Sequence, residues 1–143
     1  SKNKKRKKKI SNPHKYLNSR VKHLISSADF LKNKNINFSI LLAGNNEIKL
    51  LNKKFRKKSK TTDVLSFPFN DLRTLKKFKK KDIYLGDIIL NYYKIEKKHF
   101  IENFNKLWIH GFLHLIGHKH KKNTDYYKMN KFEKIIFNKI KKN

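Results

Sequence analysis

The sequence predicts a single α+β domain built around one hydrophobic core. A chain of 143 residues has the usual length of one domain. Short runs rich in β-branched and aromatic residues predict strands, and segments with apolar residues at helical spacing predict helices. One of these helices, over 102–116, is apolar almost all round, and a helix of that kind is normally buried. These observations predict the fold class and indicate that the helix over 102–116 lies in the core.

The elements follow one another along a chain that begins with a basic segment. Residues 1–10 are rich in lysine, and we expect them to form a disordered tail ahead of the domain, residues 11–143. Periodicity and turn residues predict, in order, a helix over 13–31, a strand over 37–43, a helix over 46–55, strands over 63–69 and 83–90, a helical segment over 91–99, the buried helix over 102–116 and an amphipathic helix over 124–141.

Local chemistry supports several of these boundaries. Asn12 and Pro13 suit the N-cap and the first position of the first helix. Pro68 indicates a strand end or a sheet edge, because proline cannot donate a ladder hydrogen bond. The charged segment over 70–82 is predicted to be a mobile connection, across which the second and third strands pair as a hairpin.

Asp87 interrupts an apolar run in the third predicted strand, directly after Gly86. Two interpretations stay open. The carboxylate belongs to a turn or bulge and bonds to backbone groups, or it lies near a functional site, where it orients a histidine or acts as a base. We therefore treat Asp87 as a candidate catalytic residue.

Four of the seven histidines fall within residues 110–120, around the end of the buried helix. His110 and His114 are four residues apart, so a helix places them on one face. Gly117 suits the left-handed position that ends a helix, and the turn that follows can return His118 or His120 to the same point. Two helical histidines and a third beyond the turn are typical of catalytic zinc with an open position. The alternative is a set of histidines that holds no metal.

The spacing of His110, His114 and His120 equals that of the metzincin proteases, but one residue opposes a peptidase. Those enzymes carry a general-base glutamate at the position that Gly111 occupies here. We therefore expect a metal hydrolase of another class. His118 is expected to lie beside the site without binding the metal, because a fourth protein ligand would close the position that water needs.

The composition favours a polyanionic partner. The net charge is +28, from 38 basic and 10 acidic residues, which favours RNA or DNA. A drift toward Lys, Asn and Ile in an AT-rich genome would raise the charge without any function. The absence of cysteine allows a reducing compartment, and we expect a cytoplasmic protein. No run of about eighteen apolar residues is present, so we expect no membrane partner.

Three blocks of the sequence together resemble the YbeY family of bacterial endoribonucleases. Residues 110–120 are similar to that family's histidine signature, His-Gly-x-Leu-His-Leu-x-Gly-(Tyr/His)-Asp-His. Residues 51–69 are similar to its Leu-Asn-x-x-(Tyr/Phe)-Arg and Thr-Asp-Val-Leu-Ser-Phe-Pro blocks, and residues 85–88 match its Leu-Gly-Asp-Ile block. The blocks occur in the family's order.

The resemblance implies a single-strand-specific, metal-dependent endoribonuclease domain that acts on ribosomal RNA and the ribosome, in 3′-end maturation of small-subunit rRNA and in ribosome quality control. It implies one zinc ion held by His110, His114 and His120, and it maps the family's site-lining arginine to Arg56. The alternative for Arg56 is an ordinary cation at a helix C-terminus. The implied fold is a small mixed β-sheet flanked by helices, with the metal site at the end of the buried helix.

The chain departs from the family pattern at several points. Lys119 replaces an aspartate that could orient a metal ligand. Ser59 and Thr61 stand where Asp and Pro are common, and residues 1–10 give no clear counterpart of the family's first strand. Two other functions remain: a noncatalytic RNA- or ribosome-binding factor whose structural metal has His118 as a fourth ligand, and a metallopeptidase. The sequence also leaves the nucleophile open between hydroxide and the RNA 2′-OH.

Overall fold

The computed structural model describes residues 29–31, 34–57, 61–118 and 122–141. Its centre is a three-stranded mixed sheet with the strand order β1-β3-β2. The strands are β1 (Asn35–Ala43), β2 (Val64–Pro68) and β3 (Asp82–Asn91). β1 is parallel to β3, and β2 is antiparallel to it, as the hairpin prediction requires. The predicted α+β domain with a small mixed sheet is confirmed.

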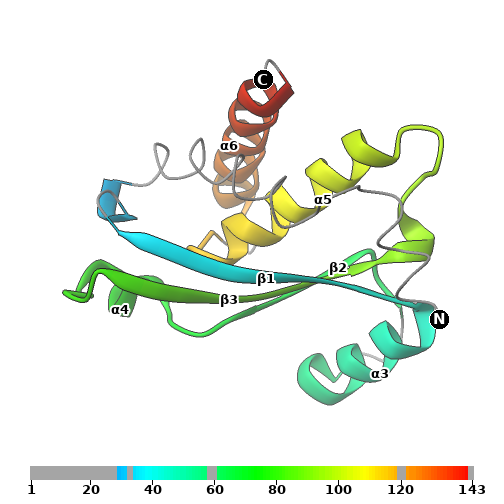
Figure 1. Ribbon diagram of the computed structural model, residues 1–143, viewed down its shortest axis with the longest axis horizontal. Helices are drawn as coiled ribbons and strands as arrows, with labels where there is room; N and C mark the ends of the chain where they lie inside the picture. The colour runs from blue at the N-terminus through cyan, green and yellow to red at the C-terminus, as the bar shows by residue number, and fades with distance from the viewer. Residues whose placement is uncertain (1–28, 32–33, 58–60, 119–121, 142–143) are drawn as a thin grey trace.

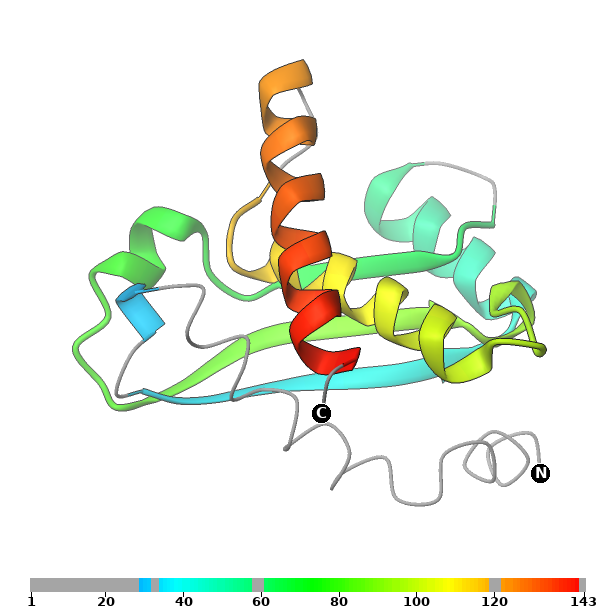
Figure 2. The ribbon, with the colours of Figure 1, turned by 90° about the horizontal axis from the view of Figure 1, so that it is seen from above.

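Helices cover the two faces of the sheet unequally. Figure 1 shows α5 (Phe100–Leu115) and α6 (Asn123–Lys141) on one side and α3 (Asn45–Arg56) under one end of the other side. A short helix, α4 (Leu72–Lys76), follows β2. Seen from above, α6 crosses α5, and its first turns extend past the β2 edge (Figure 2). One face therefore carries a helical layer along its length, while the other is covered only at an end.

The core lies between α5 and the sheet because α5 is apolar almost all round. Trp108 and Phe112 are fully buried, and the Trp108 indole N–H donates to Asn105 Oδ1 at 2.9 Å, so the buried polar group is hydrogen-bonded. β3 supplies the opposing apolar side chains: Ile83, Leu85, Ile88 and Leu90. The prediction that this helix is buried is confirmed.

A bulge in β3 decides which side chains face α5. Between the pairs Asn37–Tyr84 and Ser39–Asp87 the strand β3 holds one residue more than β1. Gly86 has φ of +144°, and a Cβ there would lie 2.2 Å from the Phe67 carbonyl oxygen, so only glycine fits. The extra residue lets Leu85 and Ile88 both face the core and turns Asp87 to the other face.

The predicted connection over 70–82 is wrong for residues 72–76, which form α4. The Asp71 carboxylate accepts from the Thr74 N–H at 2.8 Å and caps the helix, and Leu75 is buried in the core. The helix predicted over 91–99 shrinks to the 3-10 turn η2, Tyr92–Lys94.

Asn91, the last residue of β3, caps this turn and ties three segments together. Its side-chain amide is fully buried, and its Nδ2 donates to Asn45 Oδ1 at 2.7 Å and to Thr61 Oγ1 at 3.0 Å. Its Oδ1 accepts from the Tyr93 N–H. The amide therefore holds the start of α3, the segment before β2 and the end of β3 together. Thr61, where the family pattern expects proline, contributes its hydroxyl to this cluster.

Several predictions fall on residues that the structure does not describe. The tail over 1–10 and nearly all of the helix over 13–31 lie outside the described residues, as do Ser59 and Lys119; Asp29–Leu31 form a 3-10 turn, η1. Among the described helices, none combines the length and the apolar character that a membrane crossing demands.

Gly111 lets α5 lie close against the sheet. A Cβ built on it would lie 2.7 Å from Ile88 Cγ2 and 3.1 Å from Ser66 Oγ, and the Ser66 hydroxyl donates to the Gly111 carbonyl oxygen at 3.1 Å. The missing side chain lets the helix backbone lie directly on β2 and β3.

We expect Gly111→Ala to lower the free energy of unfolding by about 1–3 kcal/mol, the usual cost of overpacking a core. In an exposed helix the same change raises the free energy of unfolding by about 1 kcal/mol. A decrease in this free energy would therefore be evidence that Gly111 lies in close contact with the sheet. Urea denaturation measures the effect, with Lys106→Ala on the exposed side of α5 as the control. A Gly111→Ala protein at least as stable as the parent would show that the helix can move away from the sheet.

Candidate metal centre

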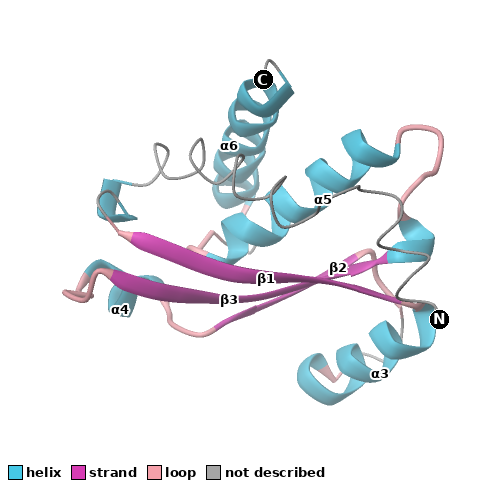
Figure 3. Ribbon diagram, viewed as in Figure 1, coloured by secondary structure: helices cyan, strands magenta, loops and turns pink. Residues whose placement is uncertain are grey.

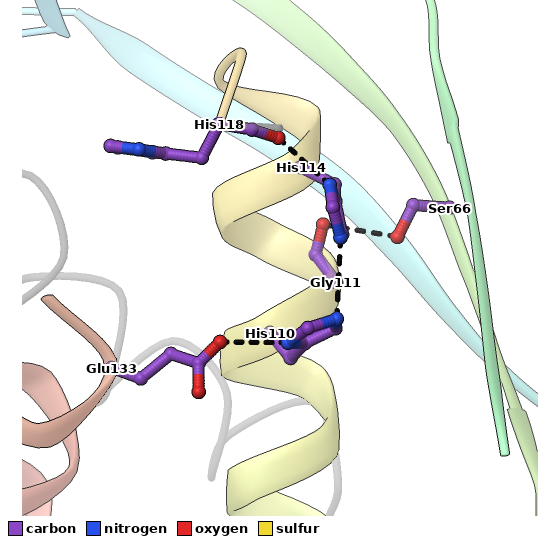
Figure 4. Close-up of polar contacts among 6 residues, drawn as sticks. All are labelled: Ser66, His110, Gly111, His114, His118 and Glu133. Carbon is purple, nitrogen blue, oxygen red and sulfur yellow. Dashed lines mark hydrogen bonds and ion pairs between the residues drawn. The ribbon is translucent and has the colours of Figure 1, made fainter. Parts of the chain in front are cut away.

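His110 and His114 form the centre of the candidate site. Both project from the last turns of α5, and their Nε2 atoms lie 3.2 Å apart, with the two rings nearly perpendicular at 78°. Figure 4 shows the two imidazoles turned toward each other along one side of the helix. Each is partly exposed, so the pair can be reached from solvent. The prediction that one helix face carries both side chains is confirmed.

The other ring nitrogen of each histidine has a fixed partner. His110 Nδ1 donates to Glu133 Oε1 at 2.7 Å, and His114 Nδ1 donates to the His118 carbonyl oxygen at 2.8 Å (Figure 4). Both partners are acceptors, which places the proton on Nδ1 in the neutral rings. Each Nε2 then presents a lone pair. Carboxylates and carbonyls in this position orient the histidine ligands of metal sites.

The facing nitrogens suit a metal ion. Two lone pairs 3.2 Å apart repel each other unless a proton or a cation lies between them. Two imidazoles on one tetrahedral zinc have their nitrogens about 3.3 Å apart, given Zn–N bonds of about 2.0–2.1 Å. The distance and the donor set therefore fit zinc. Among the described residues, no group of three or more potential metal ligands occurs.

The backbone turn after α5 sets the orientation of His114. Ile116 ends the helix and Gly117 follows with φ of +101°. The His118 N–H donates to the Leu113 carbonyl at 3.0 Å, which is the long bond of a Schellman motif. The motif brings the His118 carbonyl over His114. The predicted role of Gly117 as the helix-ending glycine is confirmed.

His118 points elsewhere. Its ring is half-buried and lies 5.2 Å from the Phe132 ring, and Figure 4 shows it directed away from the other two imidazoles. Burial lowers the pKa of His118, and the charge of Lys128 lowers it further. The neutral ring is therefore favoured, as its apolar contact requires.

The remaining predicted site residues stand in different places. His120 lies outside the described residues. Arg56 is the last residue of α3, and the description does not extend to its side chain. Asp87 does not join the histidines: it is on the opposite sheet face, where its Oδ1 accepts from the Tyr84 hydroxyl at 2.5 Å. The bulge at Gly86 is the reason for that placement, and the bond goes to a side chain rather than to backbone.

Sequence reasoning missed Glu133 and Ser66. Glu133 lies on α6, 23 residues after His110 in sequence but in direct contact with it. A signal existed, since an acidic residue is rare in this lysine-rich helix, but nothing in the sequence paired it with His110. Beside this contact lies a cleft of about 110 Å³, lined by His110, Tyr126, Met129, Asn130 and Glu133.

Comparisons with known proteins identify the family of the chain. The family described as "Endoribonuclease YbeY" matches residues 1–141. A protein of that name from Pelagibacter ubique is 45% identical over 141 residues, which cover 94% of this chain and 88% of the relative. Another from Thermodesulfovibrio yellowstonii is 30% identical, over 95% and 94% of the two chains.

A solved structure supports the fold. The solution structure of TM1509 from Thermotoga maritima aligns with a TM-score of 0.51 at 22% identity, and the alignment covers 90% of this chain and 86% of that one. At that identity the likeness concerns the fold alone. The family match and the identities over nearly the whole length decide the classification. The chain belongs to the endoribonuclease YbeY family.

Proposed function

We propose that this protein is a zinc-dependent endoribonuclease that cleaves single-stranded RNA. The observation that carries the proposal is the pair of facing Nε2 atoms, 3.2 Å apart and each backed by a fixed acceptor, in a chain whose relatives are named endoribonucleases. In the proposal, His110, His114 and His120 hold one zinc ion. The expected substrate is ribosomal RNA on the ribosome, in 3′-end maturation and quality control in the cytoplasm.

The residues of the chain have separate tasks in this proposal. When bound by three neutral imidazoles, zinc keeps its full +2 charge and supplies a Lewis acid at neutral pH. Glu133 and the His118 carbonyl hold the two helical imidazoles in the tautomer that presents Nε2. Arg56 would bind the phosphate through its planar, bidentate guanidinium. Asp87, on the other sheet face, has no task in this mechanism.

The close approach at Gly111 supports a nuclease over a peptidase. A zinc peptidase of this spacing needs a glutamate at position 111, and here even a methyl group would meet Ile88 at 2.7 Å. The site therefore offers no general-base carboxylate at that position. The net charge of +28 suits a phosphate-bearing substrate.

We expect purified protein to cleave single-stranded ribosomal RNA with about one metal ion per chain. Cleavage and metal content should fall together in His114→Ala and after chelation, because His114 supplies one of the facing nitrogens. His99→Ala, an exposed histidine at the start of α5, is the matched control and should retain both. RNA binding with one metal and no cleavage would favour the noncatalytic factor, and protein without metal would overturn the proposed site.

The products distinguish the two possible nucleophiles. Attack by the 2′-OH leaves a cyclic phosphate on the upstream fragment, whereas attack by water leaves an ordinary phosphate and hydroxyl end. Mass spectrometry of the fragments separates these outcomes. The same reaction with Arg56→Lys tests the bidentate role, because lysine keeps the charge but loses the planar fork. Full cleavage by this variant would show that Arg56 does not act through a bidentate contact.

We expect Glu133→Gln to weaken metal binding by about 10- to 100-fold, the usual effect of removing a partner that orients a ligand. Glu102→Gln on α5 removes the same charge from the exposed pair with Lys106 and should leave the affinity unchanged. Competition with a zinc-binding dye measures both variants, and thermal melts without metal check folding. Equal affinity of Glu133→Gln and the parent would show that His110 does not need the carboxylate.

A further inference from the structure

The sheet face opposite α5 carries exposed aromatic side chains that the histidine site does not use. α3 buries one end of this face, where Ala43, Leu65 and Ile89 pack around Ile48. Figure 3 shows α3 under that end only. Beyond it, Phe69 is 62% exposed and Tyr84 is 37% exposed. Phe55, at the last turn of α3, is 57% exposed.

The rings are arranged in two pairs, which we call the aromatic sheet face: Phe55 with Phe67, and Phe69 with Tyr84. The ring centres lie 5.3 Å apart in the first pair and 4.8 Å apart in the second, both edge to face. In such a pair one ring supports the edge of the other, which holds the rings in place. Fixed rings lose little conformational entropy when a ligand stacks on them.

Hydrogen bonds fix the orientation of Tyr84. Its hydroxyl donates to Asp87 Oδ1 at 2.5 Å and lies 2.6 Å from Ser39 Oγ. Burial raises the pKa of Tyr84, the hydrogen bond to Asp87 adds to the effect, and the hydrogen bond to Ser39 opposes it. The phenol is therefore neutral at physiological pH. Asp87, whose placement on this face had no role in the mechanism, positions one of the exposed rings.

Exposed lysines lie in the segments at both ends of the aromatic sheet face. Lys54 Nζ lies 5.4 Å from the centre of the Phe55 ring, and Lys53 and Lys57 are exposed at the same end of α3. At the other end, the segment that leads into β3 carries exposed lysines at 79–81. Rings bordered by lysines are the combination by which proteins bind single strands, with bases on the rings and phosphates near the cations.

We propose that the aromatic sheet face binds single-stranded RNA at a site separate from the histidine pair. Phe55 and Phe69 are the most exposed rings and would stack bases, while the lysines of α3 would contact phosphates. An apolar protein partner would not need this border of positive charge. A duplex would not present its bases to the rings, so the preference is for single strands.

The two sites lie back to back on β2. Ser66 faces α5, where its hydroxyl bonds to Gly111, while the next residue, Phe67, packs toward α3 on the other face. β2 is at one edge of the described sheet. The inference concerns binding alone, so it can be tested without metal and without cleavage, independently of the proposed nuclease activity.

The experiment measures the affinity of a fluorescent 20-nucleotide single-stranded RNA by anisotropy, in the His114→Ala background with chelator and at several salt concentrations. We expect Phe55→Ala with Phe69→Ala to weaken binding at least tenfold, since each stacked base contributes about fivefold or more. Tyr93→Ala is the matched control, because Tyr93 is 58% exposed and also pairs edge to face with a neighbouring ring, Tyr92. It should bind within twofold of the parent.

The salt dependence of RNA affinity and a conservative replacement of one ring distinguish base stacking from phosphate contacts. The double aromatic variant should keep the parent's dependence on salt, whereas Lys54→Gln should reduce it, because only the lysine neutralises a phosphate. Phe69→Trp alone should retain full affinity. Circular dichroism checks that the variants are folded. Affinity of the double variant within twofold of the parent, or equal losses for it and the Tyr93 control, would overturn the proposal and leave the face to a protein partner.

Discussion

The close contact between α5 and the sheet at Gly111 is the constraint on which the site depends. With no side chain at that position, the helix backbone lies against Ile88, and the Ser66 hydroxyl bonds to the Gly111 carbonyl at 3.1 Å. His110 immediately precedes this contact and His114 lies one turn beyond it. The height and rotation of the helix over the sheet therefore determine where both imidazoles lie. A larger residue would displace the helix, and with it the nitrogens that face each other.

The site was predictable where its residues are close in sequence and unpredictable where they are not. The i, i+4 spacing of His110 and His114 and the helix-ending Gly117 gave the pair and its turn correctly, because helix geometry is local. Glu133 could not be paired with His110, since the crossing of α6 over α5 is a tertiary feature. Asp87 was weighed as a site residue because alternation alone cannot reveal an extra residue, and the bulge at Gly86 moves it to the other face.

In the fold, too, local features were predictable from the sequence and long-range features were not. Strand and helix positions followed from periodicity, and the hairpin of β2 with β3 followed from their proximity in sequence. The parallel pairing of β1 with β3 was not derivable from local pattern, and only the resemblance implied a mixed sheet. α4 was missed because a five-residue helix gives too few turns for a periodic signal, and its cap at Asp71 is visible only with the structure.

The strand order has a consequence for how the protein folds. β2 pairs with β3 across a short connection, where Pro68 pairs with Gly86, and α5 contacts α6 through His110 and Glu133, which are 23 residues apart. β1 instead pairs with a strand far along the chain: Asn35 bonds to Asp82, 47 residues away. Long loops cost more entropy to close, which slows parallel pairing. The β2–β3 hairpin and the α5–α6 pair can therefore form first, whereas the pairing of β1 and the contact between Ser66 and Gly111, 45 residues apart, form late. Destabilising changes in β1 should then speed unfolding more than they slow folding.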